Sequence, residues 1–519
     1  MIQAGHTIRY LRDRSPAYNT EISQLMFSSS PLSSAVCIKV GALILAVVAF
    51  AVDIPRTWDK AAVDTLELPL AVGEFSPTHM DDTAYYRIPE RVIYKSYPVY
   101  APGHEPAGYM EWLKTVEPEV AFDPSTLKTQ QQWVSAGEIV FNAPTSLHPV
   151  FFTAQDLRDP NFFRETGMPV AKDGTIPFAR WVVRRKGLVE LGSMSCATCH
   201  TRVLEDGTVV PGAPGNNPND REGARLLRKS AGIVGQEKML AQVHSFARQF
   251  ELPWLPDDIN RLASSMSLDQ LIAAGEAIPP GVTARANTSI LLPPQIPDLI
   301  GVRERQFLDH TGLVRHRDIG DLMRYISLAQ DVYSSDRYGS ATIVNSSLPS
   351  ARYSDTQLYA LALYLYSLQP PPNPNHFDVS AARGNVLFAK LKCARCHTPP
   401  LYTNNELVPV EGFKVPDDAA AVMPVSIGVD PRYTLDTHKG TGYYKVPSLK
   451  GVWYRGPFGH NGSAATLEDW LDSARLNPGY VPTGFKGYDG KTRSIPGHPF
   501  GLQLSPSERE DLIAFLKTL

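Results

Sequence analysis

The spacing of apolar residues predicts two closing helices, residues 354–368 (SDTQLYALALYLYSL) and 505–519 (SPSEREDLIAFLKTL). Each segment opens on a serine that is followed three positions later by Gln357 or Glu508. In such a capping box, the serine and the Gln or Glu side chain satisfy backbone N–H groups of the first helical turn. The chain therefore contains two strong helix starts, each followed by an apolar stripe.

Two further runs are interpreted as helices, residues 181–191 (WVVRRKGLVEL) and 381–392 (AARGNVLFAKLK), and each precedes a pair of cysteines. Residues 369–375 (QPPPNPN) follow the first closing helix, and their consecutive prolines end that helix and stiffen a linker. The pattern therefore predicts two units of similar plan, residues 136–368 and 376–519, on either side of a Pro-rich linker.

The start of the chain carries an apolar run, residues 40–52 (VGALILAVVAFAV). This run is short for a membrane span and suits a secretory signal, with Lys39 as its positive flank and residues 49–51 (AFA) as a cleavage pattern. We predict that residues 1–51 are a signal peptide. An uncleaved membrane anchor through residues 40–52 is the alternative. Residues 52–135 are rich in Pro, Tyr and Glu, and we expect them to form an irregular N-terminal region.

Composition places the chain among folded proteins of more than one domain. It has 519 residues, of which 43% are hydrophobic and 20% charged. The formal net charge of −3 provides no basic field, so nucleic acid is not expected as a partner. The 44 prolines favour long irregular loops between the helices.

The cysteines give the first indication of chemistry. Four of the five form two CxxCH motifs, residues 196–200 (CATCH) and 393–397 (CARCH). Thiols at this spacing can add to the two vinyl groups of one haem, and the next histidine can bind the iron. A zinc site would need further Cys or His at similar spacing, and the sequence has no such set. The second copy argues against chance and against a simple disulfide loop. The fifth cysteine, Cys37, precedes the apolar run.

We therefore predict two covalently attached haem c groups. The residues that would hold them are Cys196, Cys199, His200, Cys393, Cys396 and His397. A helix before CxxCH and a capped helix at the end are typical of class I cytochrome c. We expect a mainly α protein with two tandem class I cytochrome c-like domains, long Pro/Gly-rich loops and the irregular N-terminal region. Because haem is attached outside the cytoplasm, a bacterial periplasmic location is expected.

The first unit is longer than the second, and we assign its extra length to residues 295–330.

The opposite face of each iron decides between electron transfer and chemistry. For the second haem, the candidate ligands are Met423, His438, His460 and His498. Packing explains Met423 more simply. His460 and His498 both lie near glycines, which let backbone approach a flat ligand closely. The residues alone do not separate these two histidines.

For the first haem, the candidates lie in the stretch 295–330. His310 and His316 could move protons to or from peroxide. Arg315 could stabilise the charge that develops as an O–O bond breaks. We take these three as candidate catalytic residues. The alternatives are a solvated helix start with mixed charges, or a histidine that closes the iron face.

Residues 445–471 (KVPSLKGVWYRGPFGHNGSAATLEDWL) begin Lys-x-Pro-x-Leu and continue to Pro-x-x-His-Asn-Gly. With the two CxxCH motifs, this segment resembles the bacterial di-haem cytochrome c peroxidase superfamily, which includes the MauG-like enzymes and the di-haem rubber oxygenases. The resemblance covers residues 181–519 and is strongest in the second unit. It implies one electron-transfer haem and one haem open to peroxide or dioxygen.

One departure from the family pattern bears on the iron ligands. The typical peroxidase uses a methionine as distal ligand of its electron-transfer haem, and no methionine follows His460 here. In the rubber-oxygenase branch, a histidine in a C-terminal Gly-His segment takes that role. The resemblance therefore implies His498 as distal ligand, with His460 shaping the pocket. The implied iron ligands are His200, His397 and His498, and the first haem would be the one that meets oxygen.

The leading hypothesis is a periplasmic di-haem c-type oxidoreductase of the cytochrome c peroxidase kind. Peroxide or dioxygen and a small redox protein would be its partners. A non-catalytic electron-transfer cytochrome with both irons six-coordinate is the main alternative, and a haem-based gas sensor is a weaker one. The sequence leaves calcium open as a further cofactor, and it does not define the substrate.

Overall fold

The computed structural model describes residues 53–71, 77–148, 150–285, 289–330, 351–417, 419, 421–490 and 493–519. The predicted signal peptide or anchor, residues 1–51 with Cys37, lies outside the described residues. Helix makes up 37% of the structure and strand 11%, so the predicted mainly α class must be extended by small sheets. None of the helices in these ranges is both long and apolar enough to cross a bilayer.

The second unit contains two crossing helices, α13 (Val379–Lys390) near its start and α16 (Pro506–Lys517) at its end. The sequence predicts both, and the predicted capping box is present at the start of α16. At the crossing, a Cβ on Gly384 would lie 1.9 Å from the carbonyl oxygen of Asp511. Only a residue without a side chain lets the two backbones approach this closely.

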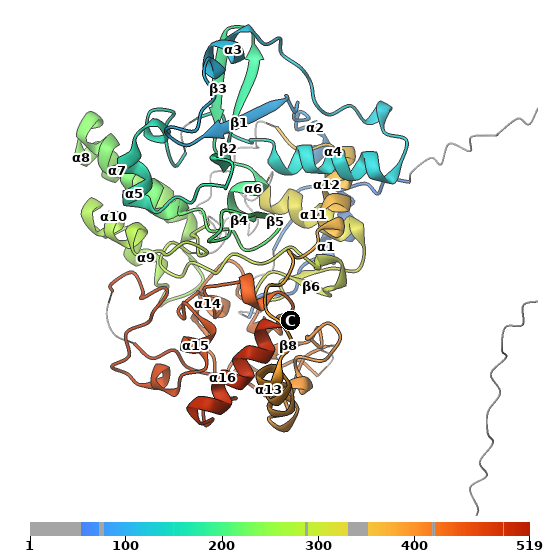
Figure 1. The fold of residues 1–519 in the computed structure, drawn as a ribbon, viewed down its shortest axis with the longest axis vertical. Helices are drawn as coiled ribbons and strands as arrows, with labels where there is room; N and C mark the ends of the chain where they lie inside the picture. Colours follow the sequence, from blue (N-terminus) through green and yellow to red (C-terminus); the bar gives the residue numbers. More distant parts are fainter. Residues whose placement is uncertain are drawn as a thin grey trace, which may run out of the picture. The chain divides into compact units, whose positions relative to one another are not determined.

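The first unit contains a matching crossing, between α4 (Gln130–Asn142) and α12 (Asp355–Ser367), and Figure 1 shows these two helices beside each other. The predicted capping box of α12 is present. A Cβ on Gly137 would lie 2.0 Å from the carbonyl oxygen of Ala360. The helix that pairs with α12 is therefore α4, which runs through the domain boundary predicted at residue 135.

The predicted helix over residues 181–191 is wrong, because this segment forms a β-hairpin. Strands β2 (Thr175–Arg185) and β3 (Leu188–Gly192) pair antiparallel, and β1 (Ser96–Tyr100) adds to the free edge of β2. The run is rich in Trp and Val, which favour strands. Gly187 has a φ of 82° and closes the tight turn, a conformation that glycine adopts without strain.

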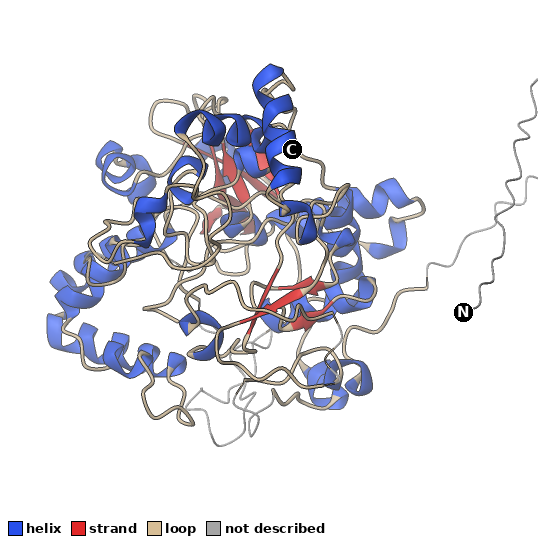
Figure 2. Ribbon diagram, turned by 90° about the horizontal axis from the view of Figure 1, so that it is seen from below, coloured by secondary structure: helices blue, strands red, loops and turns tan. Residues whose placement is uncertain are grey.

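The other described elements vary in length, and α7 is the longest helix among them. The remaining helices are α1 (Lys60–Asp64), α2 (Asp82–Arg87), α3 (Tyr109–Thr115), α5 (Pro160–Thr166), α6 (Cys196–Cys199), α7 (Asn219–Val234), α8 (Gln236–Ala247), α9 (Asn260–Ala263), α10 (Leu268–Glu276), α11 (Ile319–Gln330), α14 (Arg432–Leu435) and α15 (Leu467–Trp470). The 3₁₀ helices are η1 (Pro124–Thr126), η2 (Asp156–Arg158), η3 (Arg248–Phe250), η4 (Val302–Glu304), η6 (Cys393–Arg395), η7 (Val452–Tyr454) and η8 (Ser473–Leu476). Three two-stranded antiparallel sheets are formed by β4 (Thr201–Val203) with β5 (Val209–Pro211), β6 (Phe307–Leu308) with β7 (Val314–Arg315), and β8 (Leu407–Pro409) with β9 (Tyr443–Lys445). Figure 2 shows the strands as small groups among helices and loops.

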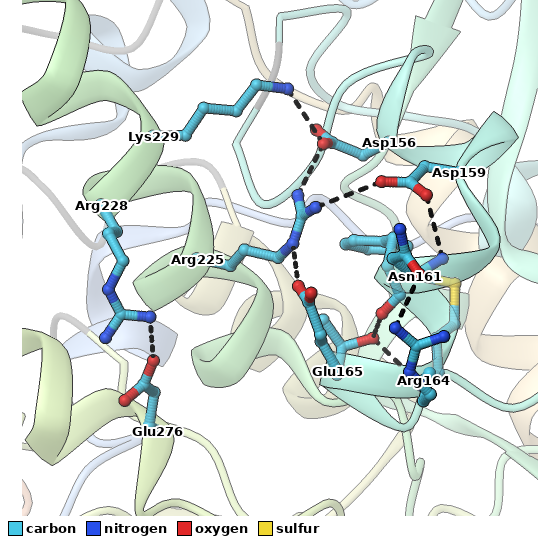
Figure 3. A network of polar contacts seen from close by, with 12 residues as sticks. Asp156, Asp159, Asn161, Arg164, Glu165, Arg225, Arg228, Lys229 and Glu276 are labelled. Carbon is cyan, nitrogen blue, oxygen red and sulfur yellow. Dashed lines mark hydrogen bonds and ion pairs between the residues drawn. The ribbon is translucent and has the colours of Figure 1, made fainter.

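Helices α7 to α10 lie together at one side of the molecule (Figure 1). Charged side chains tie α7 to η2 and α5 (Figure 3). Arg225 on α7 contacts Asp156 at 2.7 Å and Glu165 at 2.8 Å, and Lys229 reaches Asp156 at 3.1 Å. Burial alone would raise the pKa of Asp156, but hydrogen bonds from Thr153, Lys229 and Arg225 outweigh it and lower the pKa to about 2.

The N-terminal region, residues 52–135, is more regular than predicted and contributes to the largest hydrophobic core. Trp58 stacks on Tyr85 at 4.6 Å, and both are buried with residues of α4, α11 and α12. Residues 52–519 form one compact unit. The organisation into tandem cytochrome c-like domains stays a prediction, which the two matching helix crossings support.

Candidate haem sites

The first CxxCH motif lies on α6 and positions His200 directly after it. The backbone N–H of His200 bonds to the carbonyl oxygen of Cys196 at 2.9 Å. Its ring Nδ1 lies 3.1 Å from the carbonyl oxygen of Pro297. This bond orients the ring and leaves Nε2 for a metal, as in most histidine–metal sites. Burial lowers the pKa of His200 to about 4, so the imidazole is held in the neutral form that binds metals.

The second motif has the same arrangement. It lies on η6, and Nδ1 of His397 lies 3.1 Å from the carbonyl oxygen of Pro447 and 3.2 Å from that of Tyr402. Burial again lowers the pKa of the imidazole. Both histidines are therefore oriented through Nδ1 by the carbonyl group of a proline in a loop far along the chain.

Those two prolines belong to a repeat that the sequence interpretation missed. Residues 295–312 (QIPDLIGVRERQFLDHTG) and 445–462 (KVPSLKGVWYRGPFGHNG) align without gaps, and share Pro, Leu, Gly, Val, Arg, His and Gly at matching positions. In both copies the first shared glycine has a positive φ, 72° at Gly301 and 73° at Gly451, and begins a 3₁₀ helix. Comparing the sequence with itself at a spacing of 150 residues would have found it.

The repeat extends to side-chain contacts. Arg305 donates to the carbonyl oxygens of Asp298 and Ile300. Arg455 donates to the carbonyl oxygens at the matching positions 448 and 450, at 2.7 and 3.0 Å. Each arginine therefore closes the loop whose proline orients a CxxCH histidine.

The two copies also bond to each other. The backbone N–H of Gln295 donates to the carbonyl oxygen of His460, and the N–H of Lys445 donates to that of His310, both at 2.9 Å. Tyr433 lies between the two histidines, with ring centroids 6.2 Å from His310 and 6.1 Å from His460. His310 and His460 therefore occupy equivalent positions, and the carbonyl oxygen of each accepts a backbone hydrogen bond from the other half.

The repeat also corrects the predicted position of the extra length in the first unit. Residues 295–312 have a counterpart in the second unit, so they are not an insertion. The additional residues lie between the first CxxCH motif and residue 295, and they include α7 to α10.

Of the four candidates for the far face at the second site, His498 is the one that faces His397. The two ring centroids are 6.4 Å apart. Two metal–imidazole bonds of about 2 Å each, with the ring radii added, separate axial imidazole centroids by about 6 Å. Nδ1 of His498 is buried and has no hydrogen-bond partner among the described residues. This pair therefore fits a haem iron held from both faces.

The other three candidates lie elsewhere. His460 stacks on Tyr444 at 4.6 Å. Nε2 of His438 lies 3.2 Å from the carbonyl oxygen of Glu251. The sulfur of Met423 lies 3.6 Å from that of Cys396, a predicted attachment point of the second haem.

The first site opens on a cavity. His200 and Cys199 form part of its wall, and the polar side chains on the rest of the wall are Thr283, Arg285, Gln295, Asp309, His310, Tyr325, Tyr433 and Lys439. His310 bonds through Nε2 to the carbonyl oxygen of Gln295 at 2.5 Å. Within the part of the chain that the structure describes, no imidazole faces His200 as His498 faces His397.

A buried ion pair on this wall was not predicted. The ammonium group of Lys439 contacts a carboxylate oxygen of Asp309, and the hydroxyl of Tyr325 lies 3.4 Å from the same oxygen. Asp309 is 5% exposed and Lys439 7% exposed. The two residues are 130 positions apart, so no local sequence pattern brings them together.

Two of the three predicted catalytic residues lie away from this cavity. The ring of His316 is bonded at both nitrogens, to the carbonyl oxygen of Arg305 and to the hydroxyl of Tyr366, each at 2.7 Å. Arg315 donates to the carbonyl oxygens of Thr65 and Glu67. Neither lines the cavity at His200, and their predicted catalytic role stays a prediction that this placement does not support. His310 alone of the three lines the cavity.

Calcium, which the sequence left open, has no evident site in the described ranges. They contain no group of three or more His, Cys, Asp or Glu side chains placed to hold a metal ion.

Comparison with known proteins bears on the predicted resemblance. No protein-family model matches the chain. It is 26% identical to the methylamine utilization protein MauG of Methylorubrum extorquens over 334 residues, which span 63% of this chain and 73% of MauG. It is 28% identical over 170 residues to the cytochrome-c peroxidase IdrP1 of a Pseudomonas species, which covers 28% of this chain and 41% of that protein.

Among solved structures, the diheme peroxidase BthA from Burkholderia thailandensis aligns at 17% identity with a TM-score of 0.24, over 61% of this chain and 92% of BthA. The two sequence relatives confirm the predicted resemblance of this chain to the MauG-like di-haem peroxidase superfamily.

Proposed function

We propose that the protein is a di-haem c-type oxidoreductase of the peroxidase kind, with a reactive first site and an electron-transfer second site. Its relatives include MauG and a cytochrome-c peroxidase, which supports haem at the two CxxCH motifs. The periplasm is the proposed location, since c-type haem attachment requires export. A small redox protein is the proposed source of electrons.

The observation that carries the proposal is that the two sites differ on the side facing away from their CxxCH histidine. His397 has His498 opposite it at 6.4 Å, which suits an iron with both axial positions filled. His200 faces a cavity whose wall carries a buried Lys439–Asp309 pair instead. Haem bound at these residues would supply iron that exchanges electrons and, at the first site, has room for peroxide.

The chain's own groups would handle protons in the first cavity. Reduction of hydrogen peroxide consumes two protons and two electrons and yields two waters. Burial and the nearby charge of Arg285 lower the pKa of Lys439 below the usual range of a lysine. Lys439 would therefore release a proton more readily than an exposed lysine, and Asp309, which its ammonium group contacts, could replace that proton. The same positive charge would stabilise a developing anion.

An EPR spectrum of the oxidised holoprotein, followed during hydrogen peroxide addition, tests the asymmetry. We expect one high-spin ferric signal, which peroxide abolishes, and one low-spin signal. Two low-spin signals that peroxide leaves unchanged would contradict the proposal. They would favour a non-catalytic electron-transfer cytochrome in which His310 closes the first site.

The proton-handling pair is tested by Lys439→Met and Asp309→Asn. Each should lower the rate of peroxide reduction by about 10²–10³-fold without changing haem content. His316→Gln is the matched control, because His316 lies near the first half of the repeat but does not line the cavity. An equal loss in the control would show that the pair has no special role.

A further inference from the structure

We propose that Arg475 is a positioning residue for the second haem, and that it holds the loop at residues 495–498 so that His498 faces His397. This inference rests on the proposed role of His498 as an iron ligand. It does not depend on peroxidase activity, because it concerns the geometry of the second site alone.

Arg475 lies on η8 and is fully buried. Among the described residues, its guanidinium group donates only to backbone carbonyl oxygens: Nε to that of Trp470 at 2.7 Å, and the two terminal nitrogens to those of Ile495 at 2.5 Å, Gly497 at 3.0 Å and His498 at 2.9 Å. In return, the N–H of Ile495 donates to the carbonyl oxygen of Arg475 at 2.7 Å.

Burying a guanidinium group without a carboxylate partner is costly, so such a group is retained where its geometry is needed. Arg475 has no ion pair among the described residues, and its charge is offset by carbonyl dipoles and by the face of Trp470, 4.6 Å away. Its planar fork spans three carbonyl groups of one short loop. The residue that this loop presents is His498.

The loop needs such support because its backbone is strained. His498 has a φ of 48°, in the left-handed region that non-glycine residues avoid. Gly497 has a φ of 80°, and a Cβ there would lie 2.4 Å from the backbone nitrogen of Val429. The N–H of His498 bonds to the carbonyl oxygen of Ile427 at 2.8 Å. Strained residues of this kind persist where the surrounding structure over-determines them.

The ring of His498 is also held from its sides. Trp470 lies 5.6 Å from it and Phe500 lies 5.3 Å from it, centroid to centroid. Trp470 thus contacts both the guanidinium group and the imidazole. Arg475 and Trp470 together fix the distance of the His498 imidazole from His397 and its orientation.

The test measures the second haem in the purified holoprotein by EPR and by redox titration, in Arg475→Lys and Arg475→Gln. Lysine keeps the charge but cannot bond three carbonyl groups in a plane. We expect both variants to convert part of the second haem from low-spin to high-spin, more in the glutamine variant, and to shift its midpoint potential. Added imidazole should restore the low-spin signal. The signal of the first haem should stay unchanged.

Two further variants make the outcomes distinct. His498→Ala should turn the second haem fully high-spin, and if it stays low-spin the ligand assignment fails and the positioning role fails with it. Arg383→Lys is the matched control, since Arg383 lies in the same half but pairs with the carboxylate of Asp511 at an exposed position. If His498→Ala has its expected effect but both Arg475 variants keep the wild-type signal and potential, Arg475 is not a positioning residue.

If Arg475→Gln does not fold, Arg475→Lys alone decides. Wild-type g values and potential in that variant would overturn the inference. Partial conversion that imidazole reverses would support it, because a purely structural defect would not be repaired by a free ligand.

Discussion

The two CxxCH sites share one near face and differ on the far face. In both, a proline carbonyl in an 18-residue repeat orients the histidine, and an arginine closes the loop behind it. Opposite His397 stands a histidine on a strained loop, whereas opposite His200 stands a cavity wall with a buried Lys–Asp pair. A repeated scaffold can thus fix the same proximal arrangement twice, while segments outside the repeat, and positions such as Asp309 that differ between its two copies, set what each site can do.

The largest expected effect separates the two sites by removing one proximal histidine at a time. His200→Gly, with both cysteines kept, should slow the fast spectral change that peroxide causes by about 10²-fold or more, since the proposed reactive site would lose its iron ligand. His397→Gly should leave that fast change intact and slow steady turnover, because in the proposed function electrons would arrive through the second site. Stopped-flow spectroscopy measures the fast spectral change, and steady-state kinetics measure turnover. An equal loss of the fast phase in both variants would remove the distinction between the sites.

The next largest effect concerns the close helix crossing that each half contains. Gly137→Ala and Gly384→Ala would each place a Cβ about 2 Å from a carbonyl oxygen of the crossing helix. Each should lower the free energy of unfolding by about 3 kcal/mol, because the backbones must move apart. Denaturant unfolding of the holoprotein measures this.

Gly232 on α7 provides the control, since a Cβ there meets nothing within 4 Å. Gly232→Ala should stabilise the protein by about 0.5–1 kcal/mol, as expected for an exposed helical position. A loss at Gly232 similar to that at the crossings would mean that the crossings impose no special demand.

A smaller effect distinguishes the first half, which alone carries α7 to α10. The pKa of Asp156 is lowered to about 2, below the usual value of 3.8. Its contribution to stability is therefore present above pH 3.8 and is lost as the pH falls toward 2. Asp156→Asn should cost about 2 kcal/mol at pH 7, and the difference from wild type should shrink below pH 3.8.

Thermal unfolding between pH 7 and pH 3 measures this dependence. Glu165→Gln removes a more exposed partner of the same Arg225 and should change stability by less than about 1 kcal/mol. A difference between Asp156→Asn and wild type that does not vary with pH would contradict the assignment.

The smallest expected effect comes from replacing the shared arginine in each copy of the repeat. Arg305→Lys and Arg455→Lys each lose one of two carbonyl bonds in a proximal loop, and each should cost about 1 kcal/mol. Each should shift the midpoint potential of its own haem and not of the other. Arg303→Lys is the control, because Arg303 is exposed and lies over the ring of Tyr366. A shift of both potentials by a single variant would show that the loops do not act independently.

Much of this arrangement could be predicted, because some signals are local. The CxxCH spacing, the two capping boxes and α13 each depend on residues within a few turns of one another. The choice of His498 came from a family resemblance, and its role as a ligand stays a prediction that its position opposite His397 supports.

The rest depends on contacts between distant segments. Residues 181–191 could satisfy a helical pattern, but pairing with β1 makes them strands. The helix that crosses α12 precedes the first CxxCH motif by more than fifty residues, so spacing alone could not identify it. Lys439 and Asp309 meet across 130 positions. The repeat, in contrast, was available from the sequence and was missed.

The exchange between Gln295 and His460, and between Lys445 and His310, has a consequence for how the chain can be divided. Both bonds are made by backbone atoms, so amino-acid substitution leaves their donors and acceptors in place, apart from replacement of Gln295 or Lys445 by proline. Each half donates one backbone N–H to the other and accepts one in return, so the two bonds are reciprocal. The Pro-rich linker at residues 369–375 is therefore not what keeps the halves together. A chain cut there is therefore expected to remain a single particle.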